Sequence, residues 1–339
     1  MIGPPMLDPD TRGRLRGTQK VMHVKARRSL AAAISAGLLL LAGCAGDDLS
    51  DSSSGDDSPQ ASGGGEVRIS GQSFPEAALV TAMYDALLTD AGYDTTVKLV
   101  DTRDIYMGAG QFPETIDVVP EYVGGIVDFL NTTENGPNAE PLTTPDAAES
   151  IDNAQQLLDE KGITLLEPSA ATDTNAFFVT QEYSQAEGVT RLSDLEGEDV
   201  TLAAAPDCEG RPDCEGGLTE VYGIEIEEIL PLGFASDQTY QSVLDGESEL
   251  GLTSTTDGTL EAQGLVLLED DKSIQPAQNL VPAIGSDFLA EHPDLEEILN
   301  PLMAALTTEN LTELNGRVAV DREKPEDVAQ DFLEQEGLL

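Results

Sequence analysis

From Glu66 onward the chain alternates short apolar runs with longer segments in which apolar residues recur at helical spacing. Strands are expected at residues 67–69, 95–100, 116–119, 163–166, 177–180, 200–204, 229–232 and 265–268. Helices are expected after Ser73, from about Pro145 to Lys161, near Leu218 and at 238–244. This alternation predicts an α/β fold with mainly parallel sheets, which bind ligands at the carboxyl ends of their strands.

The first predicted helix begins at Ser73-Phe74-Pro75-Glu76. Its spacing of Ser and Glu is that of a capping box, and a proline near the start suits the first turn of a helix. We therefore expect Ser73 to cap this helix and Gly92 to end it.

The N-terminal residues have a different pattern. An apolar run, 30–41, follows three basic residues and ends in Leu41-Ala42-Gly43-Cys44, which has the parts of an export signal. The run is too short to span a bilayer as a helix. The cleavage site resembles that of bacterial lipoproteins, which implies a signal peptide at 1–43, with Met22 as a second possible start, and a lipid on Cys44 that anchors the chain at the extracytoplasmic face of the cell membrane. A plain secretory signal with an incidental cysteine is the alternative.

Residues 44–65 are built mainly from Asp, Ser and Gly. With almost no apolar side chain to bury, this segment is expected to be a flexible tether. The roughly 270 residues that follow are enough for one large or two medium domains.

The chain is strongly acidic, with a net charge of −47 from 17 basic and 64 acidic residues. Residues 1–43 hold seven of the basic and two of the acidic residues, so the net charge after cleavage is about −52. This charge argues against nucleic acid and against docking on anionic lipid, because both need Lys and Arg. A salt-adapted host and an ordinary acidic secreted surface explain it equally well.

Residues for catalysis are scarce. After residue 43 there is a single histidine, His292, and no GxSxG, P-loop or GxGxxG motif is present. The cysteines have no neighbouring histidine or second cysteine pair, so a zinc site is not expected either. We expect no enzyme activity, no metal and no cofactor.

Cys208-Glu209-Gly210-Arg211-Pro212-Asp213-Cys214 is a more specific pattern. In an oxidising compartment the two cysteines, separated by turn-forming residues, can close a small disulfide loop, and two free thiols are the alternative. Arg211 within this loop is either a structural ion-pair partner or the anchor of an anionic ligand group. Spacing alone favours the structural role.

Several further stretches follow one another in a fixed order along the chain: Ser73-Phe74-Pro75-Glu76, the segments 116–124, 211–213, 256–258 and 268–272 with Pro276 and Asn279, and finally 292–296. On these stretches the chain from Val67 to the C-terminus resembles the substrate-binding proteins of ABC importers for glycine betaine, choline and carnitine.

The resemblance implies a two-lobed periplasmic-binding-protein fold of type II, with hinged lobes and mixed sheets. We place the first lobe at 66–170 plus 276–339 and the second at 171–275. The C-terminal helical segment, with Pro325 at its start and Val328 and Phe332 on one face, is expected to pack on the first lobe.

The resemblance also implies ligand-binding positions, because relatives hold a quaternary ammonium group in a cage of tyrosines. Tyr122 and Tyr240 occupy cage positions, whereas Asn175 and Ser254 stand where two further tyrosines are expected. Arg211 matches the arginine that binds the ligand carboxylate, Gln72 stands at a lysine or glutamine position, and Gly125 stands at a threonine position. With Thr255, which adds a neighbouring hydroxyl, the candidate ligand-binding residues are Tyr122, Tyr240, Asn175, Ser254, Arg211, Gln72, Gly125 and Thr255.

The cage is therefore half present. Losing two ring faces costs roughly 1 to 4 kcal/mol of ligand binding. Tyr106, Phe177 and Phe178 could replace them, although core packing is the favoured explanation of these residues. Asn175, Ser254 and Thr255 could instead hydrogen-bond a more polar ligand.

The leading hypothesis is a monomeric receptor that delivers an osmolyte to the transmembrane subunit of an ABC permease. A same-fold receptor for a different polar molecule is the alternative, followed by a surface enzyme and an adhesive lipoprotein.

Overall fold

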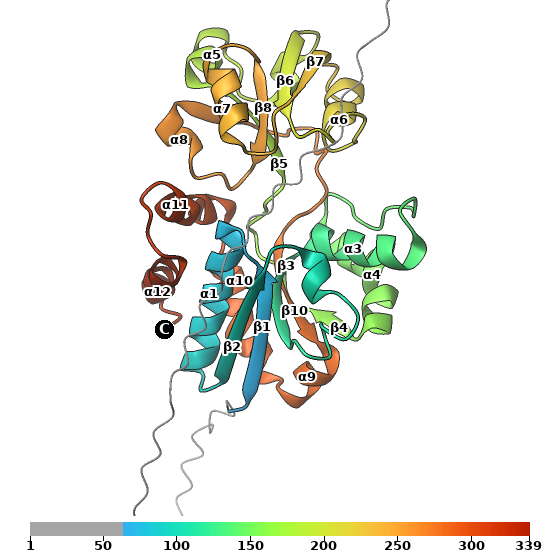
Figure 1. Cartoon of the computed structure of the whole chain (residues 1–339), viewed down its shortest axis with the longest axis vertical. Helices are drawn as coiled ribbons and strands as arrows, with labels where there is room; N and C mark the ends of the chain where they lie inside the picture. The colour runs from blue at the N-terminus through green and yellow to red at the C-terminus, as the bar shows by residue number, and fades with distance from the viewer. Residues whose placement is uncertain (1–63) are drawn as a thin grey trace, which may run out of the picture. The chain divides into compact units, whose positions relative to one another are not determined.

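The computed structural model describes residues 64–339, which contain two five-stranded sheets (Figure 1). The first sheet consists of β1 (Glu66–Gln72), β2 (Asp94–Val100), β3 (Val118–Tyr122), β4 (Ile163–Leu165) and β10 (Leu280–Gly285), in the order β2-β1-β3-β10-β4. The second consists of β5 (Asn175–Thr180), β6 (Asp199–Ala204), β7 (Glu225–Pro231), β8 (Leu250–Ser254) and β9 (Leu265–Leu268), in the order β7-β6-β8-β5-β9. We call each sheet with its helices a lobe.

The helices follow the same division. Those of the first lobe are α1 (Pro75–Asp90), α2 (Arg103–Tyr106), α3 (Val123–Asn135), α4 (Ala147–Lys161), α9 (Ser286–Glu291), α10 (Asp294–Ala305), α11 (Thr308–Ala319) and α12 (Pro325–Glu336). Those of the second lobe are α5 (Gln181–Glu187), α6 (Glu215–Glu220), α7 (Asp237–Leu244), α8 (Leu260–Gln263) and a short 3-10 helix at Leu192–Leu195. The α/β fold is thus confirmed.

Both sheets are mixed, so the mainly parallel sheets predicted from the pattern are wrong and the mixed sheets implied by the resemblance are right. β1 runs parallel to β2 and β3, whereas β10 runs antiparallel to β3 and β4. In the second sheet β6 runs parallel to β7 and β8, and β5 antiparallel to β8 and β9. The antiparallel strands β5 and β10 are those by which the chain enters a lobe after crossing from the other one.

Two strands at the third or fourth position of their sheets, β8 and β10, were not predicted from the sequence. β10 is buried throughout but contains Pro282, a residue that usually excludes a segment from the interior of a sheet. In the structure Pro282 lies opposite Pro120 of β3, so the two residues that lack an N–H share one rung of the ladder.

The start of α1 differs from the predicted capping box. Phe74, not Ser73, is the N-cap residue, and no side chain caps the helix. Ser73 Oγ instead donates to Asp101 Oδ1 at 3.3 Å. Glu76 cannot reach back toward Ser73, because its side chain is buried and accepts a hydrogen bond from Tyr122.

Other boundaries agree with the pattern. α4 ends at Gly162, whose φ of 67° is the left-handed conformation that favours glycine at this position. α12 begins at Pro325 and packs on α1, and Val328 and Phe332 are buried in the core of the first lobe. The predicted packing of the C-terminal helix on the first lobe is therefore confirmed.

The chain crosses between the lobes twice, after β4 and before β10. The two crossing segments are joined by an isolated antiparallel bridge between Thr172 and Asn279. Ala171 N also donates to Leu306 O at 3.2 Å, just before α11. The start of α11 thus lies beside the first crossing segment.

The predicted signal peptide, Cys44 and the tether up to residue 63 lie outside the described residues. Within 64–339, no helix combines the length and the apolar character needed to cross a membrane. The same residues contain no group of three or more His, Cys, Asp or Glu side chains that could hold a metal ion.

Candidate functional site

Tyr122 is the last residue of β3, at the carboxyl end of the strand, and only 7% of it is exposed. Its hydroxyl donates to Glu76 Oε1 at 2.7 Å. Burial, and next the Glu76 carboxylate, raise the pKa of the Tyr122 phenol, so the ring stays neutral. A neutral ring fixed by its hydroxyl keeps one orientation.

Phe74 adds an aromatic ring that the sequence analysis did not place in the site. Its ring stacks on that of Tyr122, with centroids 6.2 Å apart and planes 25° apart. It is also 37% exposed, which is unusual for a phenylalanine. The motif around Ser73 and Glu76 contained it, but nothing in the spacing distinguished it from a core residue.

Gln72, the last residue of β1, is half-buried and pairs with Val100 of β2. Gly125 lies in the first turn of α3, and a Cβ atom there would lie only 2.4 Å from Arg103 Nη2. The missing threonine side chain thus leaves room for an arginine that the sequence analysis overlooked.

Arg103 is held by the buried Glu121, with Nε and Nη2 each donating to one carboxylate oxygen at 2.9 Å. Burial alone lowers the pKa of Arg103, but the Glu121 carboxylate outweighs it and the pKa is raised. Tyr106, which also donates to Glu121, is buried in the core. It therefore does not replace a cage tyrosine.

Asn175 and Ser254 lie side by side in the second sheet, as partners in the register of β5 and β8. Asn175 Nδ2 donates to Asp213 Oδ2 at 2.9 Å. Phe177 and Phe178 of the same strand are fully buried, which is the core role that the sequence also allowed. The structure therefore has polar groups rather than rings at the two positions where the sequence resemblance led us to expect tyrosines.

The Thr255 hydroxyl is used within the protein. It donates to Thr172 O at 2.6 Å and accepts from Thr174 N at 3.1 Å. These bonds fasten the loop after β8 to the first crossing segment.

Tyr240 of α7 lies in the second lobe and is 8% exposed. Its hydroxyl donates to Asp257 Oδ2 at 2.6 Å, and its ring contacts Phe178 with centroids 5.4 Å apart. Burial, and next the bond to Asp257, raise the pKa of the phenol. Like Tyr122, Tyr240 is a neutral ring oriented by a carboxylate.

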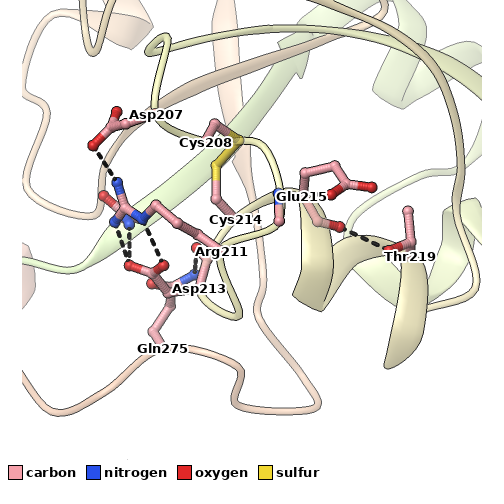
Figure 2. The surroundings of a disulfide bond; sticks show 10 residues. Asp207, Cys208, Arg211, Asp213, Cys214, Glu215, Thr219 and Gln275 are labelled. Atoms are coloured by element: carbon pink, nitrogen blue, oxygen red, sulfur yellow. Dashed lines mark hydrogen bonds and ion pairs between the residues drawn. A yellow bond between two sulfur atoms is a disulfide. The ribbon is translucent and has the colours of Figure 1, made fainter. Parts of the chain in front are cut away.

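Cys208 and Cys214 form a disulfide that closes the loop carrying Arg211 (Figure 2). The Arg211 guanidinium donates to both oxygens of Asp213, at 2.9 and 2.5 Å, and to Asp207 Oδ2 at 3.1 Å. The hydrogen bond to Asp213 raises the pKa of the guanidinium. Arg211 therefore has a structural ion pair, and 37% of its side chain remains exposed.

Two cavities lie beside Asn175 and its partner Asp213. One, of about 420 Å³, is lined in part by Asn175, Thr255 and Thr308. The other, of about 430 Å³, lies where Asp128 of the first lobe approaches Asp213 of the second. Burial raises the pKa of Asp128, in agreement with its position between the lobes.

The structure brings five of the eight predicted ligand-binding residues into one network of contacts. Tyr122 is joined to Thr256 through the hydrogen bonds of Glu76 and Asn315. The Thr256 hydroxyl lies 3.4 Å from Ser254 Oγ and donates to Asp173 Oδ1, in the first crossing segment, at 3.0 Å. Ser254 pairs with Asn175, whose side chain donates to Asp213, and Asp213 also accepts from Arg211. On the other side, Asp257 N donates to Ser254 O at 3.3 Å, and the Asp257 carboxylate accepts from Tyr240. Gln72, Gly125 and Thr255 have the separate contacts given above.

Two mixed α/β sheets joined by two crossing segments define a two-lobed α/β protein. Two solved structures share this fold: apo YehZ from Escherichia coli, with a TM-score of 0.66, 24% identity and coverage of 81% of this chain and 99% of that one, and a glycine betaine/carnitine/choline ABC transporter protein, with a TM-score of 0.68, 22% identity and coverage of 80% and 99%.

Residues 65–335 match the family described as the substrate-binding domain of ABC-type glycine betaine transport systems. The chain belongs to this family. The glycine-betaine-binding protein of Pseudomonas aeruginosa is 29% identical over 284 residues, which cover 80% of this chain and 88% of the relative.

Proposed function

We propose that this protein captures a small compatible solute with a quaternary ammonium group between its two lobes and delivers it to the transmembrane subunit of an ABC permease. The observation that carries the proposal is the hydrogen-bond network that joins Tyr122 of the first lobe, through Glu76, Asn315 and Thr256, to Ser254, Asn175, Arg211 and Tyr240 of the second. The hinged units are 66–170 plus 276–339 and 171–275, with the bridge between Thr172 and Asn279 at the hinge.

In this proposal the rings of Tyr122 and Tyr240 face the ammonium group, and each contact contributes roughly 0.5 to 2 kcal/mol. Arg211 binds the carboxylate of the solute, and Gln72 and Gly125 are further proposed ligand-binding residues. To do so, the Arg211 guanidinium must either release Asp213 and Asp207 or donate to the solute carboxylate as well as to them. A zwitterionic solute therefore competes with carboxylates of the protein itself.

A receptor for a more polar solute is the second candidate, and the side chains at the cage positions favour it. Asn175 and Ser254 supply an amide and a hydroxyl where two rings are expected, and Thr255 lies next to them. Such a ligand still binds between the lobes, without turnover and without a cofactor.

A thermal-shift screen of the purified protein with glycine betaine, choline, carnitine and proline distinguishes these candidates. A solute at one hundred times its dissociation constant adds about 2.7 kcal/mol to the free energy of unfolding. If none of the four raises the melting temperature, the osmolyte assignment is wrong.

Two substitutions test the residues assigned to the site. We expect Arg211→Ala and Tyr240→Ala each to weaken solute binding at least about tenfold, because each removes a charged or cation–π contact. Arg191→Ala is the matched control, since Arg191 is also paired with an aspartate of the second lobe, Asp194. Wild-type affinity in either of the first two variants means that the site is elsewhere.

The location of the protein is part of the proposal. Lipidation of Cys44 and the acidic tether hold the binding lobes, as a monomer, at the extracytoplasmic face of the membrane. Cys44→Ala is expected to move the protein from the membrane fraction to the soluble fraction, and an unchanged distribution refutes the anchor.

A further inference from the structure

A chain of hydrogen bonds connects the candidate ligand residue Tyr122 to the backbone of the other lobe. Tyr122 donates to Glu76 Oε1 at 2.7 Å, and Asn315 Nδ2 donates to Glu76 Oε2 at 2.5 Å. The same amide nitrogen also donates to Thr256 O at 3.0 Å. Tyr122, Glu76 and Asn315 belong to β3, α1 and α11 of the first lobe, whereas Thr256 follows β8 of the second.

Glu76 is costly for stability at this place. Only 5% of the residue is exposed, and the ion pairs of the described residues do not include it. A buried carboxylate without a basic partner depends on its hydrogen bonds. Here its donors are the tyrosine hydroxyl on one oxygen and the asparagine amide on the other. The orientation of the Tyr122 ring therefore depends on where Asn315 holds the carboxylate.

Asn315 in turn is fixed by a tight contact between the lobes. A Cβ atom at Gly258, in the second lobe, would lie 2.3 Å from the backbone nitrogen of Gly316, the residue after Asn315. Thr312 of α11 also donates to Thr255 O at 3.4 Å. Backbone thus meets backbone beside Asn315, and a shift of the second lobe changes the distance between its amide and Thr256 O.

We propose that Asn315 and Glu76 are positioning residues that make the orientation of the Tyr122 ring depend on the arrangement of the two lobes. The inference rests on the proposed function, because it takes Tyr122 as a ligand-binding residue. In this proposal neither Asn315 nor Glu76 contacts the solute. They fix the orientation of the Tyr122 ring, which does contact it. Solute affinity is then coupled to the interlobe contact behind the crossing segments.

A double-mutant cycle tests this coupling. Tyr122→Phe keeps the ring but removes the donor to Glu76, and Asn315→Ala removes the tie to the second lobe. Titration calorimetry with glycine betaine and with choline is expected to show a loss of about fivefold in affinity for each single variant. The double variant is expected to lose no more than about tenfold, because both changes break the same chain. Additive losses of about 25-fold overturn the proposal.

Asn310→Ala is the matched control, because Asn310 lies in the same helix but caps its start and bonds within the first lobe. It is expected to lower the melting temperature while leaving the affinity within about twofold of wild type.

Hydrogen–deuterium exchange of the free protein separates this inference from the proposed function. Asn315→Ala is expected to accelerate exchange in residues 118–124 and in 255–258, and Asn310→Ala in neither segment. If the wild type binds none of the solutes but this exchange pattern is found, the proposed function fails and the coupling stands. If the exchange of both segments is unchanged in Asn315→Ala, the coupling is refuted.

Discussion

The carboxyl group of Asp173 should make the stability of the protein depend on pH in a defined direction. Asp173 lies in the first crossing segment, where its Oδ1 accepts from Thr256 Oγ1 at 3.0 Å. Burial, and next the nearby Glu76 carboxylate, raise the pKa of Asp173 from 3.8 to about 7. The folded protein therefore holds a proton between about pH 4 and pH 7 that the unfolded chain releases.

The sign follows from this proton. The contribution of Asp173 to the free energy of unfolding falls as pH rises from about 4 to 7. It is constant above pH 7, where this carboxyl group is ionised in both the folded and the unfolded state. The raised pKa destabilises the folded state by at most about 4 kcal/mol at pH 8, and by about 2 kcal/mol once solvent screening is included.

Asp173→Asn isolates the effect, because an amide oxygen can accept the same bond from Thr256 and carries no charge. We expect the variant to be more stable than wild type by about 2 kcal/mol at pH 8 and nearly equal to it at pH 4.5. Urea denaturation followed by circular dichroism at both pH values measures the difference. Asp90→Asn, at the exposed end of α1, controls for the loss of one negative charge. A difference that does not change with pH, or a variant less stable at pH 8, refutes the reasoning.

Three further predictions concern stability. Cys208→Ala/Cys214→Ala is expected to lower the free energy of unfolding by about 2 kcal/mol, from the entropy of so short a loop, and a reductant should destabilise only the wild type in urea titrations. Phe332→Ala is expected to cost about 3 to 5 kcal/mol, because it empties a core site between α12 and α1, whereas the exposed Gln330→Ala should cost less than about 0.5 kcal/mol. Raising KCl from about 0.1 to 1 M is expected to raise the melting temperature by screening self-repulsion, and a fall contradicts the role assigned to net charge.

The order of strands and helices was largely predictable, because each element leaves a local pattern. α4 shows this well, because the spacing of its apolar residues predicted the helix and Gly162 predicted where the helix ends. Strand direction was harder, since it depends on partners far along the chain. Pro282 made β10 look unlike an inner strand, and only its rung with Pro120 explains its place.

The candidate site was less predictable, because the residues that orient it are mostly carboxylates. With 64 acidic residues in the chain, nothing in the sequence marks Glu76 as buried or as the partner of Tyr122. Arg103 was overlooked for a related reason, as its place depends on the absence of a side chain at Gly125. A structural ion pair for Arg211 was the alternative that spacing favoured, and in the structure its partners are Asp213 and Asp207.

The account depends most directly on whether the protein binds a quaternary ammonium solute at the interface of its lobes. Titration calorimetry of the wild type and of Tyr122→Ala with glycine betaine and choline measures this. We predict one bound solute per chain for the wild type and an affinity at least about tenfold weaker for Tyr122→Ala. Absence of binding to the wild type, or equal affinity of the two proteins, contradicts it.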